Sequence, residues 1–207
     1  MLRTNVYVDG FNLYYGAVKN RPRAKWLDLS ALCSILLTKN DVHRIRYFTA
    51  RVQARSNSPN APRNQAVYFR ALRTIPNLSI HFGHFLSHPV RLPLNSDPTR
   101  TVEVIRTEEK GSDVNLATHL LWDGFQDDYE CAVIISNDSD LAEPIRVVKN
   151  ELGKTVGIIC PHPRMSKELK PLADFVKTLR PGALHRAQFP ATLRDTKGDF
   201  HRPSAWS

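Results

Sequence analysis

At Val133-Ile-Ile-Ser136-Asn137-Asp138-Ser-Asp140, a run of apolar residues ends abruptly in polar ones, two of them aspartates. An uninterrupted apolar run of this length is typical of a strand that is buried on both faces of a parallel sheet. The stretch Val6-Tyr-Val-Asp9-Gly has the same pattern. Parallel strands end at one edge of an open α/β sheet, where ligands bind. We therefore expect these carboxylates to lie close together.

Strand-like and helix-like segments alternate along most of the chain, which predicts a three-layer α/β/α sandwich with a largely parallel central sheet. The strands are expected at residues 5–9, 43–52, 78–86, 101–106, 131–136 and 155–160, and the helices at residues 27–37, 63–75, 112–125, 141–152 and 166–179. The proline-containing stretch 88–99 reads as a connection, and the strand after it is expected to form a hairpin with the strand before it. We predict one domain over residues 1–180, followed by a basic, irregular C-terminal tail at 181–207.

The composition is that of a globular protein with ordinary reduced cysteines. No apolar run approaches the roughly 20 residues that cross a membrane, and the N-terminus lacks the layout of a signal peptide. Three cysteines, at positions 33, 131 and 160, are too widely spaced for a zinc site and odd in number. We expect buried thiols, a cytoplasmic protein and no membrane partner.

The charges are unevenly distributed. The net charge is +9, yet residues 103–143 contain 11 of the 20 acidic residues and only two of the 29 lysines and arginines. An acidic centre in a basic frame suits a polyanion that is bound widely and cut locally. A generic basic surface is the alternative explanation.

Each aspartate also has a local structural explanation. Asp9 would fit an Asx turn after its strand. Asp140 would fit the start of the next helix, because Glu143 follows it three residues later. Asp138 has no such alternative role, so the pair Asp138 and Asp140 is the stronger indication of a site.

A third polar block opens the helix expected at 112–125. Ser112 is expected to cap this helix, and Asp113 complements the helix dipole. Two neighbours point toward a ligand. Lys110 has the charge to hold a phosphate, and Gly111 lets the backbone approach a ligand closely.

Taken together, these blocks resemble a known family. Val8-Asp9-Gly-Phe-Asn12, Glu109-Lys-Gly-Ser-Asp113-Val-Asn and Ser136-Asn137-Asp138-Ser-Asp140-Leu-Ala are similar, in order and spacing, to the three signatures of the NYN family. That family belongs to the PIN-like nuclease superfamily, and the resemblance covers residues 5–179. It implies a PIN-like sandwich, bound Mg²⁺ or Mn²⁺, and hydrolysis of RNA phosphodiester bonds.

The resemblance also implies roles for individual residues. The expected catalytic residues are Asp9, Asp113, Asp138 and Asp140, of which the first three would bind metal; Asn12, Lys110, Ser136 and Asn137 would contact the metal shell or the substrate. Oxygen ligands of this kind suit Mg²⁺ or Mn²⁺. One departure is His119, which stands where many relatives have an acid. It leaves one or two metal ions as alternatives.

We therefore expect a metal-dependent ribonuclease acting on single-stranded RNA. The basic run Lys19 to Lys25 and the adjacent Trp26 would contact the backbone and stack a base. A catalytically inactive RNA-binding module on the same fold is the alternative, motivated by His119 and the basic tail. A phosphatase is disfavoured because Asp9-Gly-Phe lacks a second acid. The short apolar strand at 155–160, taken as the terminal one, would allow a homodimer.

Overall fold

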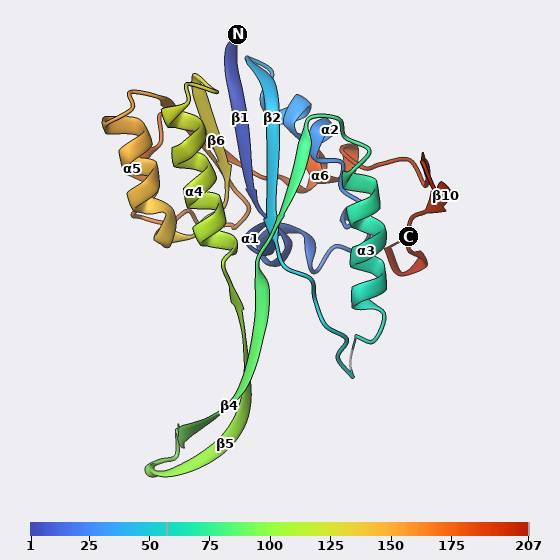
Figure 1. The fold of residues 1–207 in the computed structure, drawn as a ribbon, viewed down its shortest axis with the longest axis vertical. Helices are drawn as coiled ribbons and strands as arrows, with labels where there is room; N and C mark the ends of the chain where they lie inside the picture. The colour runs from blue at the N-terminus through green and yellow to red at the C-terminus, as the bar shows by residue number, and fades with distance from the viewer. Residues whose placement is uncertain (57, 207) are drawn as a thin grey trace.

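A six-stranded sheet lies at the centre of the computed structural model, which describes residues 1–56 and 58–206 (Figure 1). Its strand order is β3-β2-β1-β6-β7-β8, and every neighbouring pair is parallel. The strands are β1 (Leu2–Asp9), β2 (Asn40–Thr49), β3 (Leu78–Phe82), β6 (Cys131–Ile135), β7 (Thr155–Cys160) and β8 (Phe175–Thr178). The predicted parallel sheet is confirmed.

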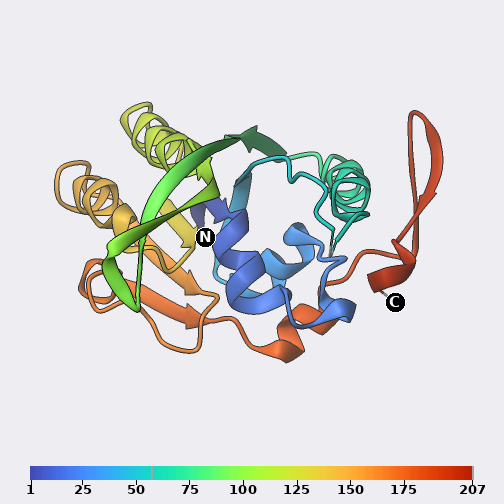
Figure 2. The ribbon, with the colours of Figure 1, turned by 90° about the horizontal axis from the view of Figure 1, so that it is seen from below.

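Helices cover both faces of this sheet (Figure 2). The longer helices are α2 (Leu29–Leu36), α3 (Ala61–Leu72), α4 (Ser112–Phe125), α5 (Ala142–Asn150) and α6 (Pro181–Arg186), and the short ones are α1 (Gly10–Leu13), η1 (Tyr14–Val18), η2 (Pro22–Ala24), η3 (Ser139–Leu141), η4 (Lys170–Leu172) and η5 (Ser204–Trp206). Two apolar cores separate the layers, one beneath α2, α3 and α6 and the other beneath α4 and α5. Val6 and Val8 point into the first core and Tyr7 into the second, as the alternation along a strand requires. No described helix is both long and apolar enough to cross a membrane.

The sheet has a topological switch point beside β1. The chain builds β2 and β3 on one side of β1 and then places β6 on the other side. Asp9 is the last residue of β1, and Asp138 follows β6 by three residues. Ligand sites of open α/β sheets form at such a point, outside the carboxyl ends of the strands.

A long two-stranded hairpin extends from the body of the molecule (Figure 1). We call it the arm; it consists of β4 (His84–Leu94) paired antiparallel with β5 (Asp97–Lys110). The predicted hairpin is confirmed, but the predicted connection at 88–99 is wrong, because most of it belongs to β4. Both strands of a two-stranded ribbon are edge strands, so Pro89 and Pro93 are tolerated where the missing N–H would face solvent.

The helix expected at 166–179 is also wrong. Its apolar residues have helical spacing, but Pro171 interrupts it, and the structure has η4 and then strand β8. Strand β8 supplies hydrogen-bond partners for β7, and the Asp174 carboxylate accepts a hydrogen bond from the Val156 N–H at 2.8 Å. Consequently β7 is an interior strand, and its edge is not free for the dimer that the sequence suggested.

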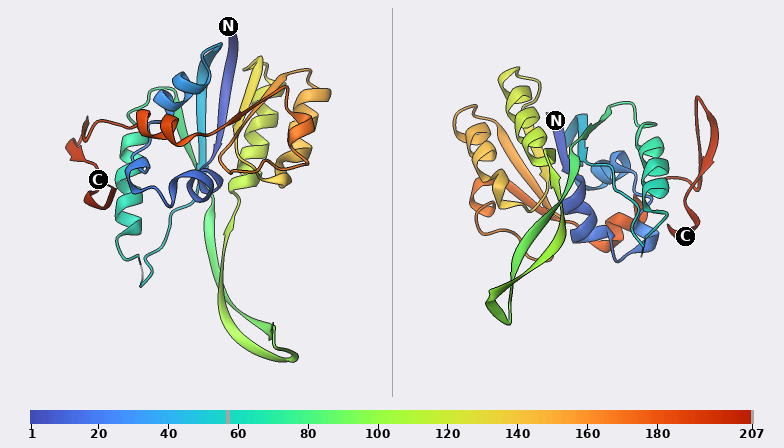
Figure 3. Two further views of the ribbon diagram at one scale, coloured as in Figure 1. Left: turned by 180° about the vertical axis from the view of Figure 1, so that it is seen from behind. Right: turned by 60° about the horizontal axis from the view of Figure 1, so that its bottom comes forward.

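The C-terminal segment is not irregular. It forms α6 and a small hairpin of β9 (Thr192–Asp195) and β10 (Gly198–His201), both visible from behind in Figure 3. Phe189 and Phe200 pack against Trp26, which is fully buried and donates a hydrogen bond from Nε1 to the Pro190 carbonyl. Trp26 therefore cannot stack on a nucleic-acid base, as the sequence had suggested. The domain division at residue 180 stays a prediction.

Candidate metal centre

Asp9 is held from two sides at the carboxyl end of β1. One oxygen, Oδ1, accepts a hydrogen bond from the Asn12 N–H at 2.9 Å, so Asp9 caps α1. The other, Oδ2, accepts a hydrogen bond from Ser136 Oγ at 2.9 Å. The Asx-turn role and the site role are thus compatible. Burial raises the pKa of the Asp9 carboxyl, and the Asp138 charge adds to this against the lowering effect of the two hydrogen bonds.

Asp138 lies opposite Asp9 in the loop after β6. Its Oδ1 accepts a hydrogen bond from the Asp140 N–H at 3.0 Å, which makes Asp138 the N-cap of η3. The sequence had offered the capping role to Asp140, and that interpretation is wrong. The Asp138 N–H donates to Ser136 Oγ at 3.1 Å, so a single hydroxyl links the loop to both Asp9 and Asp138.

Asp113 reaches the same place from the first turn of α4. Gly111, not Ser112, is the N-cap, and its φ of 92° lies in the left-handed region that favours glycine. The Glu109 carboxylate accepts hydrogen bonds from the Ser112 N–H at 3.2 Å and from Ser112 Oγ at 2.6 Å. Sequence reasoning missed this role of Glu109. The available signal was a carboxylate three residues before the first helical residue.

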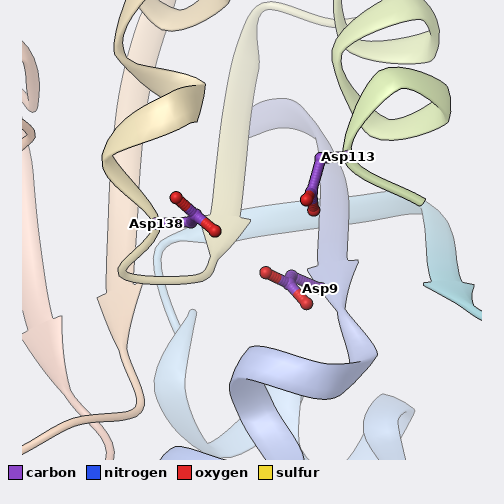
Figure 4. A group of neighbouring side chains, drawn as sticks. All are labelled: Asp9, Asp113 and Asp138. Atoms are coloured by element: carbon purple, nitrogen blue, oxygen red, sulfur yellow. The ribbon is translucent and has the colours of Figure 1, made fainter. Parts of the chain in front are cut away.

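The three aspartates converge at the switch point (Figure 4). One carboxylate oxygen from each of Asp9, Asp113 and Asp138 lies within 4.8 Å of the others. Burial first, and then the nearby charges of Asp9, Asp138, Glu109 and Asp140 in that order, together raise the pKa of Asp113 to about 6. Three carboxylates this close repel one another unless a cation or a proton lies among them. The triad can therefore bind a divalent metal, and its all-oxygen ligands suit a hard cation such as Mg²⁺ or Mn²⁺.

Three of the predicted neighbours support the loops around this acidic triad. Ser136 is buried between Asp9 and the Asp138 backbone. Asn12 Oδ1 accepts a hydrogen bond from the Asn137 N–H at 2.9 Å. Asn137 in turn accepts from the Ser166 N–H and donates to the Arg164 carbonyl, which joins the loop after β7 to the site. These side chains fix the geometry of the site.

The other two predicted residues lie outside the triad. Asp140 is exposed in η3 and supplies no oxygen to the three-residue group, although its charge raises the pKa of Asp113. Lys110 Nζ forms an ion pair with Glu108 at 2.9 Å, at the base of the arm. The structure therefore brings together three of the four predicted catalytic acids.

His119 is a residue of α4 and lies where this helix contacts β2 and the edge strand β3. Its ring centroid is 4.2 Å from that of His81 and 5.9 Å from that of Phe48. Arg46 lies close by and makes a buried bidentate pair with Asp123, at 2.7 Å for both bonds. Burial and the Arg46 charge lower the pKa of His119. His119 is thus engaged with another cluster and supplies no ligand to the described acidic triad.

Comparison with known proteins agrees with this geometry. The model of the NYN domain family matches residues 3–179, which include all three aspartates and the whole parallel sheet except Leu2, the first residue of β1. The chain belongs to the NYN domain family. The predicted family is confirmed, and with it the α/β sandwich of the PIN-like type.

Two known proteins can be compared with this NYN protein. It is 28% identical, over 239 aligned positions, to 6-hydroxy-3-succinoylpyridine 3-monooxygenase HspA of Pseudomonas putida; the alignment covers 99% of this chain and 75% of that protein. A crystal structure of a protein of unknown function from Vibrio parahaemolyticus has a similar fold, with a TM-score of 0.58 and 15% identity, over 87% of this chain and 94% of the other. The second likeness concerns the fold alone.

Proposed function

We propose that this NYN protein is a metal-dependent ribonuclease that hydrolyses RNA phosphodiester bonds. The observation that supports it best is the convergence of Asp9, Asp113 and Asp138 at the switch point of the sheet. The acids come from three separate segments, and two of them carry burial-raised pKa values. A bound divalent cation relieves this repulsion, as a proton does, so the triad is where a catalytic metal would bind.

The chain's own residues prepare this site. A bound Mg²⁺ or Mn²⁺ would supply an activated water and neutralise the charge that develops on the phosphate. Ser136 and the Asn12 N–H hold the Asp9 carboxylate, and Glu109 holds the turn that carries Asp113. Asp140 lies outside the triad and would contribute its negative charge to the site without binding the metal directly. Asn12, Ser136 and Asn137 would keep the loops in register while the substrate binds.

Positive charge and aromatic rings next to the site suit single-stranded RNA. Helix η1 follows Asp9 and the short helix α1. The Nζ atom of Lys19 lies over the ring of the exposed Tyr15, 4.9 Å from its centroid. Lys25 lies over the neighbouring Tyr14 at 5.8 Å. Stacking of bases on such rings and contacts of lysines with phosphates are the usual means of binding a single strand. Lys110 would join them once a phosphate displaces Glu108. A cytoplasmic location stays a prediction.

The test is cleavage of an end-labelled single-stranded RNA by the purified protein in Mn²⁺, Mg²⁺ or EDTA. We expect metal-dependent cleavage that falls by about a hundredfold or more in Asp9→Asn and in Asp138→Asn, because each variant removes a metal ligand. Asp140→Asn should lose less. Circular dichroism should show that each variant keeps the fold.

The matched control is Asp41→Asn, an exposed aspartate near the amino end of β2 and therefore at the opposite edge of the sheet. It should cleave RNA as the unchanged protein does. Full activity in Asp9→Asn or Asp138→Asn would refute the site. RNA binding without cleavage in any metal, indifferent to EDTA, would instead favour an inactive RNA-binding module.

A second candidate function comes from one observation, the name of the Pseudomonas relative, which describes a pyridine monooxygenase. Insertion of one oxygen atom from O₂ requires two electrons from a reductant. Non-haem iron oxygenases use two histidines and a carboxylate, whereas the acidic triad consists of carboxylates alone. The assay therefore includes 6-hydroxy-3-succinoylpyridine with O₂ and a reduced nicotinamide. Turnover of this pyridine, with no RNA cleavage, would replace our proposal by the oxygenase.

A further inference from the structure

The arm is a sheet of two strands only. Neither β4 nor β5 pairs with another described strand, and the arm projects away from the body (Figures 1 and 3). Two-stranded hairpins are marginally stable in water, and three or more strands are needed for independent stability. A further strand or a covering surface would therefore stabilise the arm.

The two outer edges of the arm differ. Strand β4 contains Pro89 and Pro93, which cannot donate backbone hydrogen bonds, so its outer edge is blocked in two places. Strand β5 has 14 residues and is free of proline from Thr99 to Lys110. Its central residues, from Thr101 to Ile105, are mostly β-branched, as in strands that pair well. Only the β5 edge is open to another strand.

The charges of the arm argue against RNA as the occupant of that edge. Between His84 and Lys110 the sequence has four basic residues (Arg91, Arg100, Arg106, Lys110) and four acidic ones (Asp97, Glu103, Glu108, Glu109). The arm is therefore neutral in a chain of net charge +9. A surface built to grip a polyanion would be rich in lysine and arginine instead. A neutral, β-branched edge suits another protein strand.

The sequence of β5 is complementary to itself when it is reversed. In a two-fold antiparallel pairing centred on Val104, Arg100 lies opposite Glu108 of the partner subunit, and Thr101 lies opposite Thr107 of the partner subunit. The two-fold symmetry repeats each of these pairs once. Pairings centred on the residues before or after Val104 would place Arg100 opposite Arg106 or Lys110, which repel. Opposite charges directly across an antiparallel pair stabilise it and like charges destabilise it.

The register of the arm fits the same centre. Pro89 and Pro93 pair with Ile105 and Thr101, so these odd-numbered positions are those whose N–H groups point away from the partner strand. Along β5 the odd-numbered residues therefore offer their N–H and C=O groups to the open edge. Centring on Val104 places Glu103 opposite Ile105 of the partner subunit, and these two exchange both hydrogen bonds.

We propose that a second copy of this chain pairs with the first along the open edge of β5, with the two-fold axis at Val104, to form a continuous four-stranded sheet from the two arms. The exposed apolar residues Leu92, Val102 and Val104 lie on one face of the arm, together with Val90. In the paired sheet the apolar faces of the two copies meet at Val104, which lies against Val104 of the partner subunit, whereas Val102 lies opposite Arg106 of the partner subunit. The pairing is independent of the proposed nuclease activity, and a dimer that cleaves no RNA leaves it intact.

The first test measures the mass of the full chain in solution by light scattering and sedimentation over a range of concentrations. We expect a dimer that Glu103→Pro dissociates, with a dissociation constant raised by about tenfold or more, because two hydrogen bonds across the axis are lost. The matched control is Arg91→Pro. Arg91 and Glu103 are cross-strand partners and form an ion pair. Both variants lose that pair and place proline at the same level of the arm, but Arg91→Pro alters only the blocked β4 edge and should stay dimeric.

The second test fixes the register by disulfide formation. In a non-hydrogen-bonded antiparallel pair the opposite Cα atoms are about 4.5 Å apart, within the range that a disulfide spans. Val104→Cys should therefore form a covalent dimer under mild oxidation by O₂. Val102→Cys should not, because residue 102 faces residue 106 of the partner subunit. The native cysteines are all buried, which keeps the background low.

Three outcomes would overturn the proposal. The first is a wild-type chain that is monomeric at all concentrations. This outcome includes a monomer that binds RNA and whose RNA binding is lost in Glu103→Pro. The second is a dimer that survives Glu103→Pro as well as Arg91→Pro. The third is a dimer in which Val102→Cys cross-links as readily as Val104→Cys.

Discussion

At the scale of single residues, the site depends on carboxylates that are held where they repel one another. Ser136 and the Asn12 N–H fix Asp9, and Glu109 fixes the turn before Asp113. The first turn of α4 favours a negative charge at Asp113 through the helix dipole. Burial and the neighbouring acids outweigh this effect, since the pKa of Asp113 is raised and not lowered.

This balance predicts a pH dependence of stability in the metal-free protein. The pKa of Asp113 rises from 3.8 in the unfolded chain to about 6 in the folded one. The folded state therefore binds the proton more tightly, so this contribution to stability is present below about pH 4 and is lost as the pH rises to 6. In EDTA, Asp113→Asn should be more stable than the unchanged protein above pH 6, and the difference should vanish near pH 4.

The measurement is the melting temperature of both proteins from pH 4 to 8, with Asp41→Asn as control. At pH 7, Mn²⁺ should raise the melting temperature of the unchanged protein and have a smaller effect on Asp113→Asn. A variant that melts at a lower temperature than the unchanged protein in EDTA at pH 7 would contradict the repulsion.

At the scale of elements, the arm and helix α4 meet at the site. Strand β5 ends at Lys110, and α4 begins two residues later. Gly83 lies against this junction so closely that a Cβ atom there would be 2.3 Å from Glu109 Oε1 and 2.4 Å from the Lys110 carbonyl. The tight packing explains why the strand expected at 78–86 is divided into β3 and β4 at this glycine.

The same junction predicts the effect of Glu109→Gln. The amide oxygen still accepts from the Ser112 N–H, but the amide NH2 can only donate to Ser112 Oγ, so two charge-assisted hydrogen bonds become neutral ones. We expect a loss of about 1–2 kcal/mol in the free energy of unfolding, measured by urea denaturation. Glu108→Gln is the matched control. The ion-pair partners of Glu108 within the subunit, Arg106 and Lys110, are exposed, so we expect a cost of about 0.5 kcal/mol. Equal losses in the two variants would show that Glu109 does not hold the helix start.

At the scale of the whole molecule, the C-terminal segment closes one face of the core. The Arg70 guanidinium pairs bidentately with Asp195 and lies 4.2 Å from the centroid of the Phe200 ring. Phe200 and Phe189 enclose Trp26. The segment beyond residue 180 thus contributes to the same apolar core as the family domain.

Phe200→Ala tests this contribution. Deleting a buried aromatic ring from a core costs about 3–5 kcal/mol, so we expect a loss of that order in the free energy of unfolding. Val176→Ala, at an exposed position of β8, should cost less than about 1 kcal/mol. A separate, earlier transition in Phe200→Ala, with the main transition unchanged, would show that the C-terminal segment folds apart from the rest.

The sequence by itself determined the parallel sheet, the family and the three aspartates. Buried parallel strands are apolar along their whole length, and a carboxylate directly after such a run is visible without any partner. The bounds of α4 and β7 were predicted for the same reason, because their patterns are local.

Only the tertiary structure decided the rest, because those features depend on what a segment lies against. The segment 166–179 has apolar residues at helical spacing, but its residues 175–178 form strand β8 because they hydrogen-bond to β7. The prolines of β4 look like breakers but are harmless at an outer edge. Trp26 looks like a base-stacking residue until the C-terminal aromatic residues cover it. Ser136 matters through its hydrogen bond to Asp9, 127 residues away in the sequence, and such a bond exists only once the fold has brought both ends together.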